Sequence, residues 1–118
     1  AIVSGCLLYY YSQRRRARSH ISLSPDIAVV VSGASRGLGK ATALYLCNKH
    51  GLTVFCGVRK PQDGTNLLQL ADTSNGGQII PMQLDITSVK ECQAALETIQ
   101  NTKGVKHVHA IICCAGVG

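Results

Sequence analysis

β-Branched runs alternate with segments of helical periodicity from residue 27 onward, and this alternation restricts the fold more than any other feature. The expected strands are residues 27–31, 53–58, 78–84 and 108–114, and the expected helices are residues 38–50, 67–71 and 88–103. Parallel strands need crossover connections, which helices usually supply. The order βαβαβαβ therefore predicts an α/β fold, a doubly wound parallel sheet with helices on both faces.

Local signals place the elements within that sheet. Pro81 cannot donate a ladder hydrogen bond, so its strand should lie at a sheet edge, in agreement with a strand order of 3-2-1-4. Ser88 and Glu91 have the spacing of a capping box at a helix start. Helical spacing also predicts the buried faces. These are Leu38, Ala41 and Tyr45 in the first helix, and Val89, Cys92, Leu96 and Ile99 in the last.

A glycine-rich turn, Ser32-Gly33-Ala34-Ser35-Arg36-Gly37-Leu38-Gly39, joins the first strand to the first helix. Glycines permit a tight turn and close backbone approach, and a helix N-terminus offers free amides to an anion. An ordinary βα loop is the simpler interpretation, but the position between strand and helix favours pyrophosphate binding. The rival NTPase loop, G-x-x-x-x-G-K-[ST], is disfavoured because Ala34 and Ala41 replace its glycine and its hydroxyl residue.

The spacing of Gly33, Gly37 and Gly39 resembles the cofactor loop of the short-chain dehydrogenase/reductase family, with Ser32 replacing the usual threonine. Leu84-Asp85-Ile86 is similar to the family segment after strand three, whose aspartate contacts adenine. Cys113-Cys114-Ala115-Gly116 is similar to the N-N-A-G motif after strand four, with cysteines in place of both asparagines. The resemblance implies a Rossmann-type sheet, with residues 26–118 as the N-terminal part of a dinucleotide-binding domain.

The end of the second strand indicates which cofactor is bound. An NAD site usually carries an acid about 20 residues after the glycine turn, whereas Arg59 and Lys60 stand here. Arg36 and Arg59 can bind a 2′-phosphate through charge-assisted hydrogen bonds, although solvated loop charges are a simpler explanation of the basic pair. We expect NADP(H). The expected cofactor-binding residues are Gly33, Ser35, Arg36, Gly37, Leu38, Gly39, Arg59, Asp85, Ile86, Cys114, Ala115 and Gly116.

The resemblance implies hydride transfer between the nicotinamide and an alcohol, ketone or aldehyde, with Ser, Tyr and Lys moving the proton. The last two form Y-x-x-x-K and normally follow the N-N-A-G position, so no catalytic residue is assigned. The match at Tyr45 and Lys49 lies on the first crossover helix and is interpreted as core packing.

Because the sequence starts without methionine and stops after the fourth strand, we expect a fragment. A non-catalytic NADP(H)-binding sensor or interaction module is the alternative.

Residues 1–25 differ from the rest in composition and predict a leader. An apolar stretch ends in three tyrosines, and a basic segment without acids follows, containing Arg14, Arg15, Arg16 and Arg18. This pattern is typical of a membrane interface. It predicts a truncated anchor in the endoplasmic reticulum, with the folded part in the cytosol. An organelle transit peptide and an unstructured leader are the alternatives. An anchor, and the similarity of residues 54–60 to retinol and hydroxysteroid dehydrogenases, favour a lipophilic substrate.

The remaining composition narrows the possible partners. The formal charge of +6 belongs mainly to the leader, so nothing predicts a nucleic-acid-binding face. The six cysteines lack C-x-x-C spacing and are expected as reduced, largely buried thiols. His107 and His109 lack further ligands, so no metal is predicted. A homo-oligomer is expected for the full-length protein.

Overall fold

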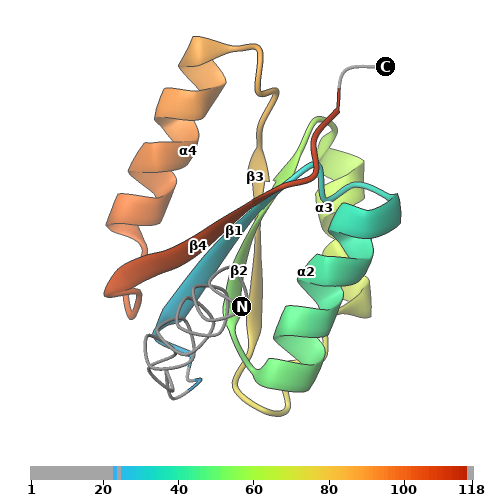
Figure 1. The fold of residues 1–118 in the computed structure, drawn as a ribbon, viewed down its shortest axis with the longest axis vertical. Helices are drawn as coiled ribbons and strands as arrows, with labels where there is room; N and C mark the ends of the chain where they lie inside the picture. Colours follow the sequence, from blue (N-terminus) through green and yellow to red (C-terminus); the bar gives the residue numbers. More distant parts are fainter. Residues whose placement is uncertain (1–22, 24, 117–118) are drawn as a thin grey trace, which may run out of the picture.

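The computed structural model of this chain describes residue 23 and residues 25–116, which form a sheet between two helical layers. In chain order the elements are β1 (Ile27–Ser32), α2 (Gly37–His50), β2 (Thr53–Val58), α3 (Pro61–Leu70), β3 (Gln78–Gln83), α4 (Val89–Asn101) and β4 (His107–Cys113). All strand pairs are parallel, and the order is β3-β2-β1-β4. The predicted Rossmann-type topology is confirmed. Figure 1 shows α2 and α3 on one face of the sheet and α4 on the other.

Alternating residues of the central strands build a separate core on each face of the sheet. Val29 and Val31 of β1 pack with Val54 and Cys56 of β2 in the core that α2 and α3 cover. Their neighbours Ala28, Val30 and Phe55 join the core beneath α4. Because strand residues point to opposite faces with a period of two, a strand covered on both sides needs a continuous apolar run.

β3 lies at one edge of the sheet, as Pro81 predicts. Pro81 is in register with Cys56 of β2, and β2 is the only neighbour of β3 in the described sheet. Proline is tolerated there because an edge strand can turn the position that lacks an N–H away from its partner. The observed β3 ends one residue before the strand expected at residues 78–84. The observed β4 begins and ends one residue earlier than the strand expected at residues 108–114.

The predicted buried face of α2 is wrong. Leu38 is 79% exposed and Tyr45 is 56% exposed, and Ala41 is also exposed. The residues that α2 buries are Gly39, Ala43 and Cys47. These are spaced at four-residue intervals, and their small side chains let the helix axis approach the sheet. Tyr45 instead meets His50 edge to face, with ring centroids 5.0 Å apart, so its core-packing interpretation is also wrong.

The other two helices also differ from expectation. α3 begins at Pro61 rather than near Leu67, because proline is well suited to the first position of a helix. In α4 the buried residue is Ala95, and Ile99 packs against the core. Val89 and Leu96 are 73% and 54% exposed. Cys92 is also exposed, so only one of the four predicted positions contacts the core.

Cys6 lies outside the described residues, and the other cysteines differ in burial. Cys47 and Cys56 are buried, whereas Cys92 and Cys113 are exposed, so burial was predicted for too many of them. Burial, with a smaller contribution from Cys47, raises the pKa of the Cys56 thiol to about 12. Cys56 therefore stays uncharged and serves as a small apolar core residue.

The leader predicted over residues 1–25 lies almost wholly outside the described residues. Among the residues that the structure describes, no helix combines the length and the apolar character needed to cross a bilayer.

Candidate functional site

A cavity of about 440 Å³ lies at the carboxyl edge of the sheet. The segments that follow all four strands contribute to it, because parallel strands end at a common edge. The chain leaves β1 toward β2 on one side and later crosses from β3 to β4 on the other side of β1. Ligands of open α/β sheets bind at such a switch point. The cavity is lined by Gly33, Arg36, Arg59, Leu84, Asp85, Ile86, Thr87, Cys114, Ala115 and Gly116.

The glycine turn leaves β1 through two left-handed residues and then enters α2. Gly33 has φ 68° and Gly37 has φ 61°, a region in which side-chain-bearing residues are strained. The Ala34 amide donates to the carbonyl of Gly57 at 3.0 Å. After β4, the Cys114 amide donates to the carbonyl of Ser32 at 3.2 Å. The turn is therefore held in place by the ends of both neighbouring strands.

Two glycines of the turn are needed for close packing. A Cβ added to Gly33 would lie 2.6 Å from the Ala115 nitrogen. A Cβ added to Gly39 would collide with the Gly33 carbonyl and approach Cys114 Cβ to 3.1 Å. By contrast, a Cβ at Gly37 would meet nothing within 4 Å. Gly33 and Gly39 thus serve the packing of turn, helix and strand, and the turn is open at Gly37.

The start of α2 is suited to an anion. Its first turn contains no acidic residue, and the N-cap residue, Arg36, makes no side-chain capping hydrogen bond. The first amides of a helix have no partner within the helix and carry the positive end of its dipole. The exposed guanidinium groups of Arg36 and Arg59 line the same cavity and add positive charge.

Asp85 brings a fixed negative charge to the same cavity. Its Oδ1 accepts hydrogen bonds from the Thr87 hydroxyl at 2.6 Å and the Thr87 amide at 2.9 Å. These bonds, with a smaller contribution from nearby Arg59, lower the pKa of the Asp85 carboxyl below its ordinary value. The carboxylate is therefore ionised at neutral pH, and its position is set by the loop.

The structure brings most of the expected binding residues together. Those that line the cavity are Gly33, Arg36, Arg59, Asp85, Ile86, Cys114, Ala115 and Gly116. Ser35, Gly37 and Leu38 belong to the turn or the first turn of α2 but do not line the cavity, and Gly39 is buried behind it. Leu84 and Thr87 also line the cavity, although neither was among the expected binding residues. The D-x-T spacing of Asp85 and Thr87 was the available signal, because short polar side chains form such local turns.

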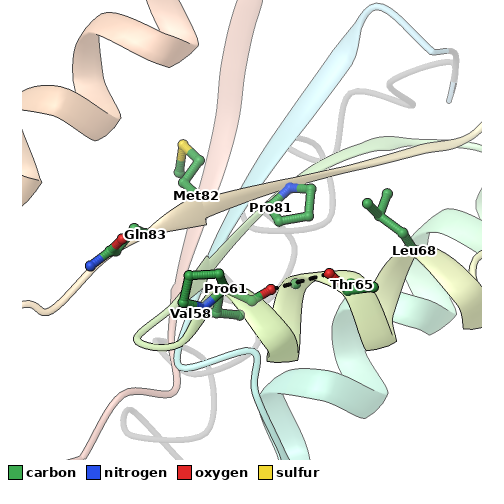
Figure 2. A pocket seen from close by; sticks show the side chains of 8 residues that line it. Val58, Pro61, Thr65, Leu68, Pro81, Met82 and Gln83 are labelled. Atoms are coloured by element: carbon green, nitrogen blue, oxygen red, sulfur yellow. Dashed lines mark hydrogen bonds between the residues drawn. The ribbon is translucent and has the colours of Figure 1, made fainter.

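A second cavity, of about 380 Å³, lies between α3 and the edge strand β3. Figure 2 shows Pro61, Thr65 and Leu68 of α3 facing Pro81 of β3 across it. No charged residue is among those that line it, so it lacks the groups that hold a phosphate. In the part of the chain that the structure describes, no three His, Cys, Asp or Glu side chains gather as metal ligands would.

Known proteins with similar sequences include ketoreductases and dehydrogenases. The family model for short chain dehydrogenases matches residues 27–118. Norsolorinic acid ketoreductase of Aspergillus parasiticus is 27% identical over 93% of this chain and 41% of its own length. Human retinol dehydrogenase 11 is 32% identical over 79% of this chain and 29% of its own length. The chain thus spans well under half of these curated relatives.

Solved structures share the fold. A short-chain type dehydrogenase/reductase from Mycobacterium ulcerans superimposes with a TM-score of 0.70 at 29% identity, over 82% of this chain and 34% of that protein. L-sorbose reductase from Gluconobacter frateurii, solved with NADPH and L-sorbose, gives a TM-score of 0.69 at 18% identity, over 82% of this chain and 35% of that protein.

Replacement of Gly39 by alanine tests the packing of the turn. We expect Gly39→Ala to lower the free energy of unfolding by about 1–3 kcal/mol, the usual cost of overpacking, because backbone atoms of Gly33 must move. Gln62→Ala also introduces an alanine into a helix, but at an exposed position of α3; it is the control and should change stability by less than about 0.5 kcal/mol. Urea unfolding of the full-length variants measures both, and equal stability of the two would contradict the assignment.

Proposed function

We propose a function for this chain, which belongs to the short-chain dehydrogenase family. The protein that contains it is an NADP(H)-dependent oxidoreductase of alcohols and of ketones or aldehydes. The observation that carries the proposal is the one cavity that Arg36, Arg59 and Asp85 line, with the uncapped start of α2 directly after Arg36. When bound, the cofactor supplies the hydride chemistry. This chain supplies binding and orientation.

The residues present fit a dinucleotide. The amides that begin α2 would hold the diphosphate, and the turn is sterically open at Gly37. Asp85 and the half-exposed Ile86 offer a carboxylate and an apolar surface for the adenosine part. The backbone at Cys114 and Ala115 would border the nicotinamide part. Cysteines here cannot offer the amide groups of the family's asparagines, so we assign these positions a backbone role only.

Charge at the cavity supports NADP(H) over NAD(H). Arg36 and Arg59 line it, and two guanidinium groups can share a 2′-phosphate. Among the structural relatives, the L-sorbose reductase is described with NADPH, and an alcohol dehydrogenase from Thermococcus sibiricus is described with 5-hydroxy-NADP.

Removal of one guanidinium group tests the cofactor preference. We expect Arg59→Ala to weaken NADPH binding by about tenfold to a hundredfold, as for loss of a hydrogen bond between charged groups, and to leave NADH binding nearly unchanged. Lys60→Ala is the matched control, because the exposed Lys60 does not line the cavity. Cofactor titration of the full-length protein measures each constant. NADH binding as tight as NADPH binding in the wild type would exclude the preference.

The proposed substrate is a lipophilic alcohol or carbonyl compound. The support comes from the leader composition and from relatives named for norsolorinic acid and retinol. We expect the full-length protein to have a higher kcat/KM for lipid ketones, aldehydes or alcohols than for short water-soluble ones. A substrate panel measures this, and preference for soluble compounds would refute it. NADPH binding without turnover of any of them would favour the non-catalytic sensor.

We also propose that residues 1–25 anchor the protein to the endoplasmic reticulum membrane, with the sheet in the cytosol. β1 starts directly after the leader, at the edge of the sheet opposite the cavity, so an anchored protein would present the cavity away from the bilayer. We expect deletion of residues 1–25 to move the full-length protein from the carbonate-resistant membrane fraction to the soluble fraction. A wild-type protein found only in the soluble fraction, or inside another organelle, would overturn the anchor.

A further inference from the structure

Glu91, in the first turn of α4, makes an unexpected pair of contacts. In a capping box its carboxylate would return to the backbone amide of Ser88. The other half of the box is present, because the Glu91 amide donates to Ser88 Oγ at 3.2 Å. The Ser88 amide, however, donates to the Asp85 carbonyl at 3.0 Å. The Glu91 carboxylate is therefore free to bind elsewhere.

That carboxylate joins the end of β3 to the cavity loop. Glu91 Oε2 accepts from the Asp85 amide at 2.6 Å, and Oε1 accepts from Gln83 Nε2 at 3.0 Å. Figure 2 shows the Gln83 side chain on β3, with its amide directed away from Pro61 of α3. Hydrogen bonds to an ionised acceptor are shorter and stronger than neutral ones, so this carboxylate is well suited to fix the loop.

Asp85 is consequently held from two sides. Its backbone amide is bound to Glu91, and its side chain is bound to Thr87. Residues 84–87 all line the cavity, whereas Glu91 does not. Any effect of Glu91 on a ligand must therefore act through the loop. If Glu91 is lost, the partly buried Asp85 amide lacks its acceptor, and the wall of the cavity can shift.

We propose that Glu91 is a positioning residue that fixes the adenosine side of the cofactor cavity through the Asp85 amide. This inference rests on the proposed function, because it presumes that a nicotinamide dinucleotide occupies the cavity. It concerns the half of the ligand next to residues 84–87 and predicts no effect on the half next to Cys114. A ligand that lacks adenosine can therefore separate a local role from a general loss of structure.

The test compares binding of NADPH and of reduced nicotinamide mononucleotide, which lacks the adenosine half, in the full-length protein. Glu91→Asp keeps the negative charge at the helix start but withdraws the carboxylate by one methylene. We expect it to raise the Kd for NADPH about tenfold and to leave the Kd for the mononucleotide unchanged. Glu97→Asp makes the same chemical change at an exposed position of α4 and should match the wild type for both ligands.

Glu91→Gln provides the rescue. The new amide oxygen can accept from the Asp85 amide, and Gln83 can turn its own amide to present an acceptor to the new NH₂ group. We therefore expect an NADPH affinity within about threefold of the wild type. This change is much smaller than the one expected when a charge-assisted hydrogen bond is lost. Wild-type affinity in Glu91→Asp, or an equal loss for both ligands, would overturn the positioning role. If the wild type itself does not bind NADPH, the proposed function fails instead, whatever the Glu91 variants do.

Discussion

The contact between the glycine turn and the chain after β4 is the constraint on which the rest of the site depends. The Gly33 backbone touches Ala115, and Gly39 lies against both Gly33 and Cys114. Side chains at either glycine would separate the start of α2 from the end of β4. With both strands bound to the turn through Ala34 and Cys114, the first amides of α2 are fixed at the edge of the sheet. An anion bound there would meet donors that need no rearrangement, which would lower the entropy lost on binding.

Parallel topology converts this single contact into a cavity. Since every strand ends at the same edge, the glycine turn meets Arg59 after β2, Asp85 after β3 and Ala115 after β4. These residues are far apart in sequence, and only the strand order β3-β2-β1-β4 makes them neighbours. No residue of the three described helices lines the cavity. Their role is to bury the two faces of the sheet and so to keep the strand ends in register.

Sequence patterns predicted the topology well because the relevant signals are local. The β-branched runs identified strands, Pro81 predicted which strand lies at the sheet edge, and Gly33 to Gly39 marked the turn. Which helix face is buried was less accessible, because it depends on how closely the helix approaches the sheet. Large apolar residues such as Leu38 and Tyr45 suggested burial, yet the close approach of α2 requires small ones at Ala43 and Cys47. Likewise, the capping-box spacing identified the start of α4 but not the partner of the Glu91 carboxylate, which depends on the path of the preceding loop.

The charges around the cavity explain how an acid and two arginines can share one anion site. An ionised Asp85 repels a phosphate group placed next to it. Thr87 holds the carboxylate in place without removing its charge, and nearby Arg59 offsets part of that charge. Arg36 and the start of α2 have no acidic partner in the first helical turn. The cavity therefore combines two positive side chains, Arg36 and Arg59, with one negative side chain, Asp85, that lies near Arg59. A ligand that carries both phosphate groups and a base with hydrogen-bond donors matches this combination better than a free phosphate does.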